Sequence, residues 1–376
     1  MEEIGEGAMF APPAPRAPDA KTKRNALIQG VVALAILVIV FGFVLPQVID
    51  YKQVWETIKA LEPWQIGALI LAGLITYIPE GWLYALLVPV LRLRQGAAAW
   101  VASTGVASTI PAVDLVVRYG MYRSWKASAE GAMLGIILSG VFDNVVKFSL
   151  PVIAILGIAT GGVGDFDGGL VIIAVIALLV LVATLVIVIG VVRSERFTQS
   201  LGNRLEQFVN WVLGLFKKDP IETLAPRVVG FRDAAIGLVG KVWFRAGLAS
   251  AMGKLWTFLI LLMSLRFVGI TSDVISTRDA FIVWAIVLLI GSIPLTPGGV
   301  GFVELGFVFL FTQVAGDQYT NTIGAAVALY RLVQWAMPIP IGWGVVLWWR
   351  RSVAKGKLPD PFAQAAPGDG SAPQES

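Results

Sequence analysis

Apolar residues in this chain gather into long runs that are separated by short polar stretches. Six of the runs lie at about residues 26–48, 64–91, 127–158, 170–192, 242–267 and 322–349. Roughly 18 consecutive apolar residues suggest a membrane-spanning helix. The pattern therefore predicts an all-α, polytopic integral membrane helical bundle with about six full spans.

Two weaker runs, residues 96–117 and 280–314, are broken by proline and glycine. Each contains a Ser/Thr-Ile-Pro step, which ends at Pro111 in the first run and at Pro294 in the second. Lipid cannot hydrogen-bond a broken backbone, so irregular chain survives at membrane depth only where protein or a water-filled cavity covers it. Both runs therefore predict a protected polar site inside the membrane domain.

Basic residues mark the cytoplasmic ends of the runs, because cytoplasmic loops carry an excess of Lys and Arg. They gather at Lys21, Lys23, Arg24, Arg92, Arg94, Arg350, Arg351, Lys355 and Lys357. Residues 193–241, with eight basic and five acidic residues, are predicted to form a cytoplasmic amphipathic segment. We therefore expect an inner-membrane protein with both termini in the cytoplasm. Its Pro/Ala-rich ends, residues 1–25 and 351–376, are predicted to be disordered tails.

These anchors constrain the two broken runs. Residues 96–117 begin and end inside, whereas residues 280–314 begin outside and must return there if the last span is to end inside. Two re-entrant hairpins from opposite faces satisfy both conditions, and they predict an inverted repeat with a site near the midplane. The alternative is that residues 96–117 cross fully and that the topology is shifted.

Composition narrows the class of function. Hydrophobic residues make up 57% of the chain, charged residues only 14%, and the mean hydropathy is +0.78, whereas soluble domains have about 25% charged residues. Without Cys or His, the chain has no disulfides, thiolate nucleophiles, Cys/His zinc sites or histidine acid–base chemistry. We expect no enzyme activity, no metal and no other cofactor. The net charge of +4 sits at span ends, which indicates anionic lipid rather than nucleic acid.

Charged residues inside the apolar runs are candidates for function, because each costs about 2.5–3.5 kcal/mol to insert. Four are acidic and four are basic: Glu80, Asp114, Asp143, Glu304, Arg118, Lys147, Lys254 and Arg331. Equal numbers indicate mutual neutralisation. The pairs Asp114/Arg118 and Asp143/Lys147 are spaced i, i+4 and share a helix face, so they are expected as internal salt bridges or as substrate contacts.

The second broken run has features that suit a phosphate. Glu304 begins a half-helix just after Gly298-Gly299, and the N-terminus of such a helix offers free N–H groups and a positive dipole end to an anion. Arg331 carries a planar fork of donors that matches phosphate. We expect Arg331 and Arg118 to be neighbours of this segment.

The stretch T-P-G-G-V-G-F-V-E carries a family resemblance. It matches the pattern T-P-G-G-x-G-x-x-E at Thr296, Pro297, Gly298, Gly299, Gly301 and Glu304. Here the sequence resembles the flippase domain of lysylphosphatidylglycerol synthases and their stand-alone UPF0104-type relatives. The resemblance covers about residues 25–350 and extends to Pro111, Asp114, Arg118, Asp143 and residues 330–333, although the glycine expected before Asp114 is missing.

This resemblance implies a flippase-like membrane domain at residues 26–350. Such a domain would translocate an anionic, aminoacylated, glycosylated or polyprenyl-phosphate lipid across the cytoplasmic membrane. Bifunctional members carry a soluble aminoacyl-transferase domain after the membrane part, where this sequence has a short polar tail. We therefore expect lipid movement without lipid synthesis.

The expected substrate contacts follow from that implied function. Arg331 and Arg118 would hold the lipid phosphate. Glu304, Asp114 and Asp143 would balance these bases or meet a cationic headgroup. Lys147 and the residues of the glycine-rich motif complete the expected binding set.

Two alternatives stay open on the sequence alone. A secondary transporter of a small solute would use the same inverted repeat, with the charged pairs coupling ions. A membrane scaffold would present a lipid to a separate glycosyl- or aminoacyl-transferase. In each case the partners are a membrane lipid or solute and, as a further expectation, a second copy of the chain in a homo-oligomer.

Overall fold

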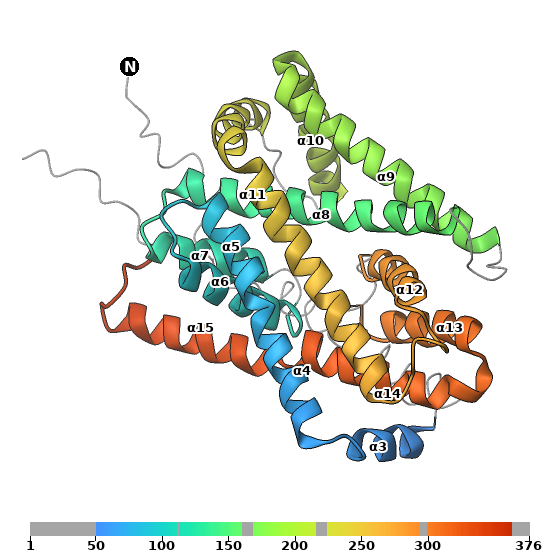
Figure 1. Cartoon of the computed structure of the whole chain (residues 1–376). Helices are drawn as coiled ribbons and strands as arrows, with labels where there is room; N and C mark the ends of the chain where they lie inside the picture. The colour runs from blue at the N-terminus through green and yellow to red at the C-terminus, as the bar shows by residue number, and fades with distance from the viewer. Residues whose placement is uncertain (1–49, 111–112, 160–167, 216–223, 293–298, 363–376) are drawn as a thin grey trace, which may run out of the picture.

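In this computed structural model the described residues are 50–110, 113–159, 168–215, 224–292 and 299–362 (Figure 1). Regular structure in these ranges is entirely helical, which confirms the predicted all-α class. The first predicted span, the N-terminal tail and residues 363–376 of the C-terminal tail lie outside the described residues.

The helices follow the chain in this order: α3 (Tyr51–Lys59), α4 (Pro63–Ile75), α5 (Tyr77–Leu87), α6 (Leu93–Ala107), α7 (Asp114–Ser124), α8 (Ala129–Ala159), α9 (Gly168–Arg193), α10 (Glu195–Leu215), α11 (Leu224–Phe267), α12 (Thr277–Ile290), α13 (Phe302–Ala315), α14 (Thr320–Arg331) and α15 (Pro338–Ala354). A 3₁₀ turn, Asp317–Tyr319, precedes α14, and a π-helical turn, Leu332–Ala336, follows it.

Four helical stretches are long and apolar enough to cross a membrane: Pro63–Leu87, Ala129–Ala154, Ala235–Phe267 and Asp317–Ala354. They correspond to four of the six predicted spans. The predicted span at residues 170–192 falls on α9, which passes the same test only together with the start of α10, from which it is bent by 119°. The described residues therefore supply four or five spans.

The boundary between α10, α11 and the span differs from the prediction. Residues 193–241 were predicted as a cytoplasmic amphipathic segment, which stays a prediction, and the span after them was expected to begin at about residue 242. Instead α11 runs without interruption from residue 224 to residue 267, and its apolar stretch begins at Ala235. The physical reason is that a helix is held by its backbone hydrogen bonds. It can therefore continue across the point where its side chains change from polar to apolar.

The break between α4 and α5 has a simple cause. Pro79 has no N–H to donate to the carbonyl of Ile75, and its ring clashes with that carbonyl. Accordingly α4 ends at Ile75 and α5 begins at Tyr77. The helix assignment is thus interrupted just before Glu80, and α4 and α5 together form one candidate span. The bend of this span near Pro79 stays a prediction.

Glycines allow α6 to pack closely against two neighbours. A Cβ atom added to Gly96 would lie 2.1 Å from the carbonyl oxygen of Gly81 on α5. On the other side, a Cβ on Gly342 of α15 would lie 2.4 Å from the carbonyl oxygen of Val101. Small residues permit this backbone approach, as is common between membrane helices.

The two predicted hairpins correspond to two pairs of short helices. In one pair α6 packs against α7, and in the other α12 packs against α13. The breaks at residues 111–112 and 293–298, which hold both prolines of the shared step, lie outside the described residues. Entry of the two pairs from opposite membrane faces, and with it the inverted repeat, stays a prediction.

Candidate functional site

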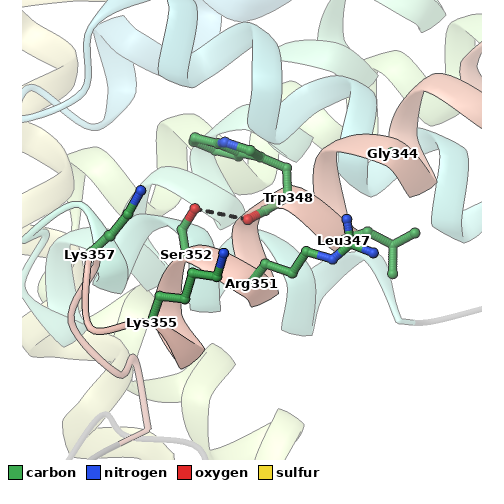
Figure 2. A pocket seen from close by; sticks show the side chains of 7 residues that line it. All are labelled: Gly344, Leu347, Trp348, Arg351, Ser352, Lys355 and Lys357. Atoms are coloured by element: carbon green, nitrogen blue, oxygen red, sulfur yellow. Dashed lines mark hydrogen bonds between the residues drawn. The ribbon is translucent and has the colours of Figure 1, made fainter.

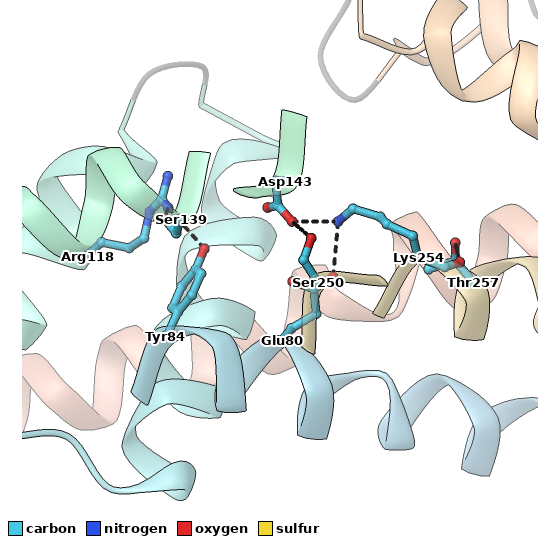
Figure 3. Close-up of polar contacts among 8 residues, drawn as sticks. All are labelled: Glu80, Tyr84, Arg118, Ser139, Asp143, Ser250, Lys254 and Thr257. Carbon is cyan, nitrogen blue, oxygen red and sulfur yellow. Dashed lines mark hydrogen bonds and ion pairs between the residues drawn. The ribbon is translucent and has the colours of Figure 1, made fainter. Parts of the chain in front are cut away.

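A shared lysine joins three helices of the bundle (Figure 3). The Lys254 ammonium on α11 lies 3.1 Å from Glu80 Oε1 on α5 and 3.1 Å from Asp143 Oδ1 on α8. The Ser250 hydroxyl, one turn before Lys254, donates to Asp143 at 3.0 Å. Glu80 is only 1% exposed, and a buried carboxylate is tolerated only with such a partner.

Room for this carboxylate comes from Gly253. A Cβ atom at that position would lie 2.6 Å from Glu80 Oε1. The sequence Gly253-Lys254 therefore supplies both the space and the counter-charge for Glu80. Glu80 and Lys254 stood out in the sequence as charges in apolar runs, but they were not assigned to the expected site.

The predicted Asp143/Lys147 salt bridge is not formed. Asp143 is bound by Lys254 and Ser250 from the facing helix, and Lys147 makes no hydrogen bond or ion pair in the part of the chain that the structure describes. The spacing i, i+4 brings two residues to one face of a helix, but a facing helix with two donors satisfies the carboxylate instead.

Arg118 is the centre of a second polar group. Its Nη2 donates to Asp114 Oδ2 at 2.7 Å, so the predicted salt bridge within α7 is present. Its Nη1 donates to the Tyr84 hydroxyl at 3.0 Å and to the Ser139 hydroxyl at 3.3 Å. Figure 3 shows Arg118 between α5 and α8. Its hydrogen bonds in the described residues go to α5, α7 and α8, and the expectation that Arg118 neighbours the second broken run stays a prediction.

Glu304 explains the spacing of the glycine-rich motif. Its Oε2 accepts the backbone N–H of Gly301 at 2.6 Å, which caps the start of α13. Gly301 has φ +91° and Gly299 has φ +67°, a region that glycine adopts without steric cost. The motif residues Thr296, Pro297 and Gly298, like Pro111, lie outside the described residues.

The same carboxylate binds Arg331. Arg331 Nε donates to Glu304 Oε1 at 2.6 Å and joins the end of α14 to the start of α13. This contact confirms that Arg331 lies beside the broken run. Both side chains are largely buried, with side-chain exposures of 14% and 10%.

A cavity of about 160 Å³ lies beside this pair, between α8, α12, α13 and α14. Among its lining residues are Lys147, Trp284, Gly291, Val303, Phe307, Tyr330 and Arg331. Two of these are basic, and no acidic residue in the described ranges lines it. The buried indole N–H of Trp284 makes no hydrogen bond of normal geometry to the residues that the structure describes. The cavity is therefore electropositive and rich in donors.

The expected site residues are thus divided among three polar groups. Asp114 and Arg118 form the first, and Asp143 belongs to the second with Lys254. Of the expected residues that the structure describes, Lys147 and Arg331 face a common cavity, and Glu304 contacts Arg331. Within the described ranges no group of His, Cys, Asp and Glu could hold a metal ion.

The model of the family described as "Lysylphosphatidylglycerol synthase TM region" matches residues 30–342. This range includes all three polar groups and the cavity. No curated protein sequence matches the chain.

Proposed function

The chain belongs to the lysylphosphatidylglycerol synthase TM-region family, and from that premise we propose that it translocates a phosphate-bearing lipid across the cytoplasmic membrane. Membership and the membrane-spanning helices indicate a membrane protein in lipid-related processes. The observation that carries the finer proposal is Lys147, a cation inside the membrane domain that faces a cavity and has no ion pair with any described residue.

An uncompensated charge is costly inside a membrane, so such residues usually mark a substrate pathway. Lys147 and Arg331 line the same cavity from α8 and α14. An anionic group that enters the cavity would supply the partner that Lys147 lacks. Phosphate suits this arrangement, because it accepts several charge-assisted hydrogen bonds at once.

The size of the cavity favours a headgroup rather than a whole lipid. A volume of about 160 Å³ equals that of a few water molecules at roughly 30 Å³ each. Two acyl chains do not fit there and would stay in the surrounding bilayer. The anionic, aminoacylated, glycosylated and polyprenyl-phosphate lipids all present a phosphate that could enter in this way.

The other two polar groups are better suited to structural roles. Lys254 and Arg118 already contact carboxylates at 3.1 Å and 2.7 Å. A phosphate could reach either base only by displacing a buried carboxylate, which is unfavourable. Arg331 is likewise paired, with Glu304 at 2.6 Å, but it lines the same cavity as Lys147. We therefore assign phosphate binding to Lys147, with Arg331 beside it, and not to Arg118.

Reconstituted vesicles with a labelled anionic phospholipid test this proposal through the rate at which the label changes leaflet. Lys147→Gln should slow translocation at least tenfold. Lys52→Gln, an exposed lysine on α3 without an ion pair, should leave the rate unchanged. If Lys147→Gln, Arg331→Ala and Glu304→Gln all translocate lipid at the wild-type rate, the assignment is wrong.

A second candidate, a secondary transporter of a small solute, is favoured by one observation. Two carboxylates, Glu80 and Asp143, share the single ammonium of Lys254, and Glu80 Oε2 is buried without a hydrogen bond of normal geometry to any described residue. Such a group could take up and release a coupling proton. Proton-driven solute uptake by vesicles that show no lipid movement would support this candidate over lipid translocation.

A further inference from the structure

A second pocket lies at the C-terminal end of α15, beyond the residues that match the family (Figure 2). Its volume is about 340 Å³, and its lining comes entirely from residues 344–357. It belongs to none of the three polar groups. Any ligand there is independent of the cavity around Lys147.

One end of the pocket is cationic. Lys355 and Lys357 lie there, and Arg351 also lines the pocket, with its side chain extending toward Leu347 (Figure 2). No acidic residue in the described ranges lines the pocket. None of the three bases forms an ion pair within those ranges. Three positive charges around one concave surface, with no counter-charge of their own, create a site for an anion.

The backbone after α15 holds two of these bases in place. Gly356 has φ +66° and turns the chain back, so that the Lys357 N–H bonds to the Ser352 carbonyl at 2.9 Å. In Figure 2 the side chains of Lys355 and Lys357 both lie close to Ser352 at the helix end. This C-terminal glycine turn fixes the cationic end against the last turn of the helix.

The other end of the pocket is apolar and open. Leu347 and Trp348 line it and are 47% and 55% exposed. A Cβ atom added to Gly344 would meet nothing within 4 Å. From Gly344 to Arg351 the helix rises about 10 Å at 1.5 Å per residue. The apolar slot therefore leads along the candidate span Asp317–Ala354 to the cationic end.

We propose that this pocket binds an anionic phospholipid of the membrane in which the chain is embedded. The headgroup phosphate lies among Arg351, Lys355 and Lys357, and an acyl chain follows the slot past Trp348 to Gly344. A basic cluster directly after a membrane span attracts anionic headgroups, and Trp is favoured at the level of the headgroups. The apolar slot is the reason for assigning a lipid rather than a soluble phosphate.

Native mass spectrometry of the full chain in mild detergent measures the number of lipids bound. Phosphatidylglycerol should bind, and its binding should fall about tenfold in Lys355→Gln/Lys357→Gln. Phosphatidylcholine should bind weakly to both proteins. The control Lys52→Gln/Lys241→Gln removes two exposed lysines that have no ion pair, and should bind phosphatidylglycerol like the wild type.

A second variant separates a lipid from a soluble anion. Gly344→Leu fills the slot without touching the basic residues, so it should lower phosphatidylglycerol binding severalfold, and excess inorganic phosphate should not displace the lipid. The proposal is overturned if the double variant binds phosphatidylglycerol normally, or if inorganic phosphate competes as well as the lipid. Neither readout depends on lipid translocation.

Discussion

Asp143 lies one helical turn before Lys147 on α8, yet its carboxylate pairs with Lys254 on α11 at 3.1 Å. This choice of partner has two effects. It joins α8 to α11 and, through Glu80, to α5. It also leaves Lys147 without the carboxylate of Asp143, at the cavity that Arg331 lines as well.

Replacing Lys254 with Met should lower the free energy of unfolding by about 3–5 kcal/mol, because Glu80 and Asp143 would stay buried without a cation. Denaturant titration in detergent measures this loss. Lys241→Met, an exposed site on the same helix, is the control and should change stability little. Adding Glu80→Gln to Lys254→Met should recover part of the loss, and no recovery would contradict the proposed cause.

Substitutions of Glu304 should separate its two contacts. Glu304→Gln keeps an oxygen that can accept the Gly301 N–H but loses the charge that faces Arg331. Glu304→Ala loses both, so it should be less stable than the Gln variant by about 1 kcal/mol, the usual value of a helix cap. Thermal unfolding in detergent gives the comparison. Equal midpoints for the two variants would show that the cap contributes nothing.

Gly342 and Gly344 lie two residues apart on α15, on different faces of the helix, and should respond in opposite ways to alanine. Gly342→Ala places a Cβ 2.4 Å from the Val101 carbonyl oxygen and should cost about 1–3 kcal/mol through overpacking. Gly344→Ala meets nothing within 4 Å and should be neutral or stabilise the helix by up to about 1 kcal/mol. Thermal midpoints of the two variants check the difference, and equal shifts would refute close packing of α6 on α15.

Arg118 and Tyr84 should be energetically coupled. Arg118→Lys keeps the charge but loses the fork that reaches Asp114, Tyr84 and Ser139 together. A double-mutant cycle with Tyr84→Phe should give a coupling energy of about 0.5–3 kcal/mol. Tyr330→Phe, which lies in the other apolar core, serves as the uncoupled control. If the effects of Arg118→Lys and Tyr84→Phe are additive, the 3.0 Å contact between Arg118 and the Tyr84 hydroxyl contributes nothing to stability.

The sequence predicts local features of this fold well. Apolar runs locate the helices of four spans, because a span is defined by the length and polarity of one segment. Pro79 locates the break between α4 and α5, and this too is a local feature, because a proline disrupts the helix in which it lies. The salt bridge between Asp114 and Arg118 is likewise internal to α7.

Partners between helices are harder to predict. Nothing in the sequence around Asp143 shows that Lys254 will approach it, because that contact depends on how α8 and α11 pack. Arg118 was expected near the glycine-rich run, but its partners come from α5, α7 and α8. The position of Arg331 beside the broken run was predicted correctly. Because α13 and α14 are consecutive helices, Glu304 and Arg331 are kept close together.

The position of α6 between α5 and α15 has a consequence for the order of events during synthesis. α5 comes off the ribosome just before α6, so their glycine contact can form at once. The other side of α6 must wait for α15: the Trp343 indole N–H donates to the Thr109 hydroxyl across 234 residues of chain. At about 5–20 residues per second this wait is about 10–50 s. For that time the groove at Gly105 is open to any other helix in the membrane, so nascent chains that stall before α15 should be the ones that membrane quality control recognises.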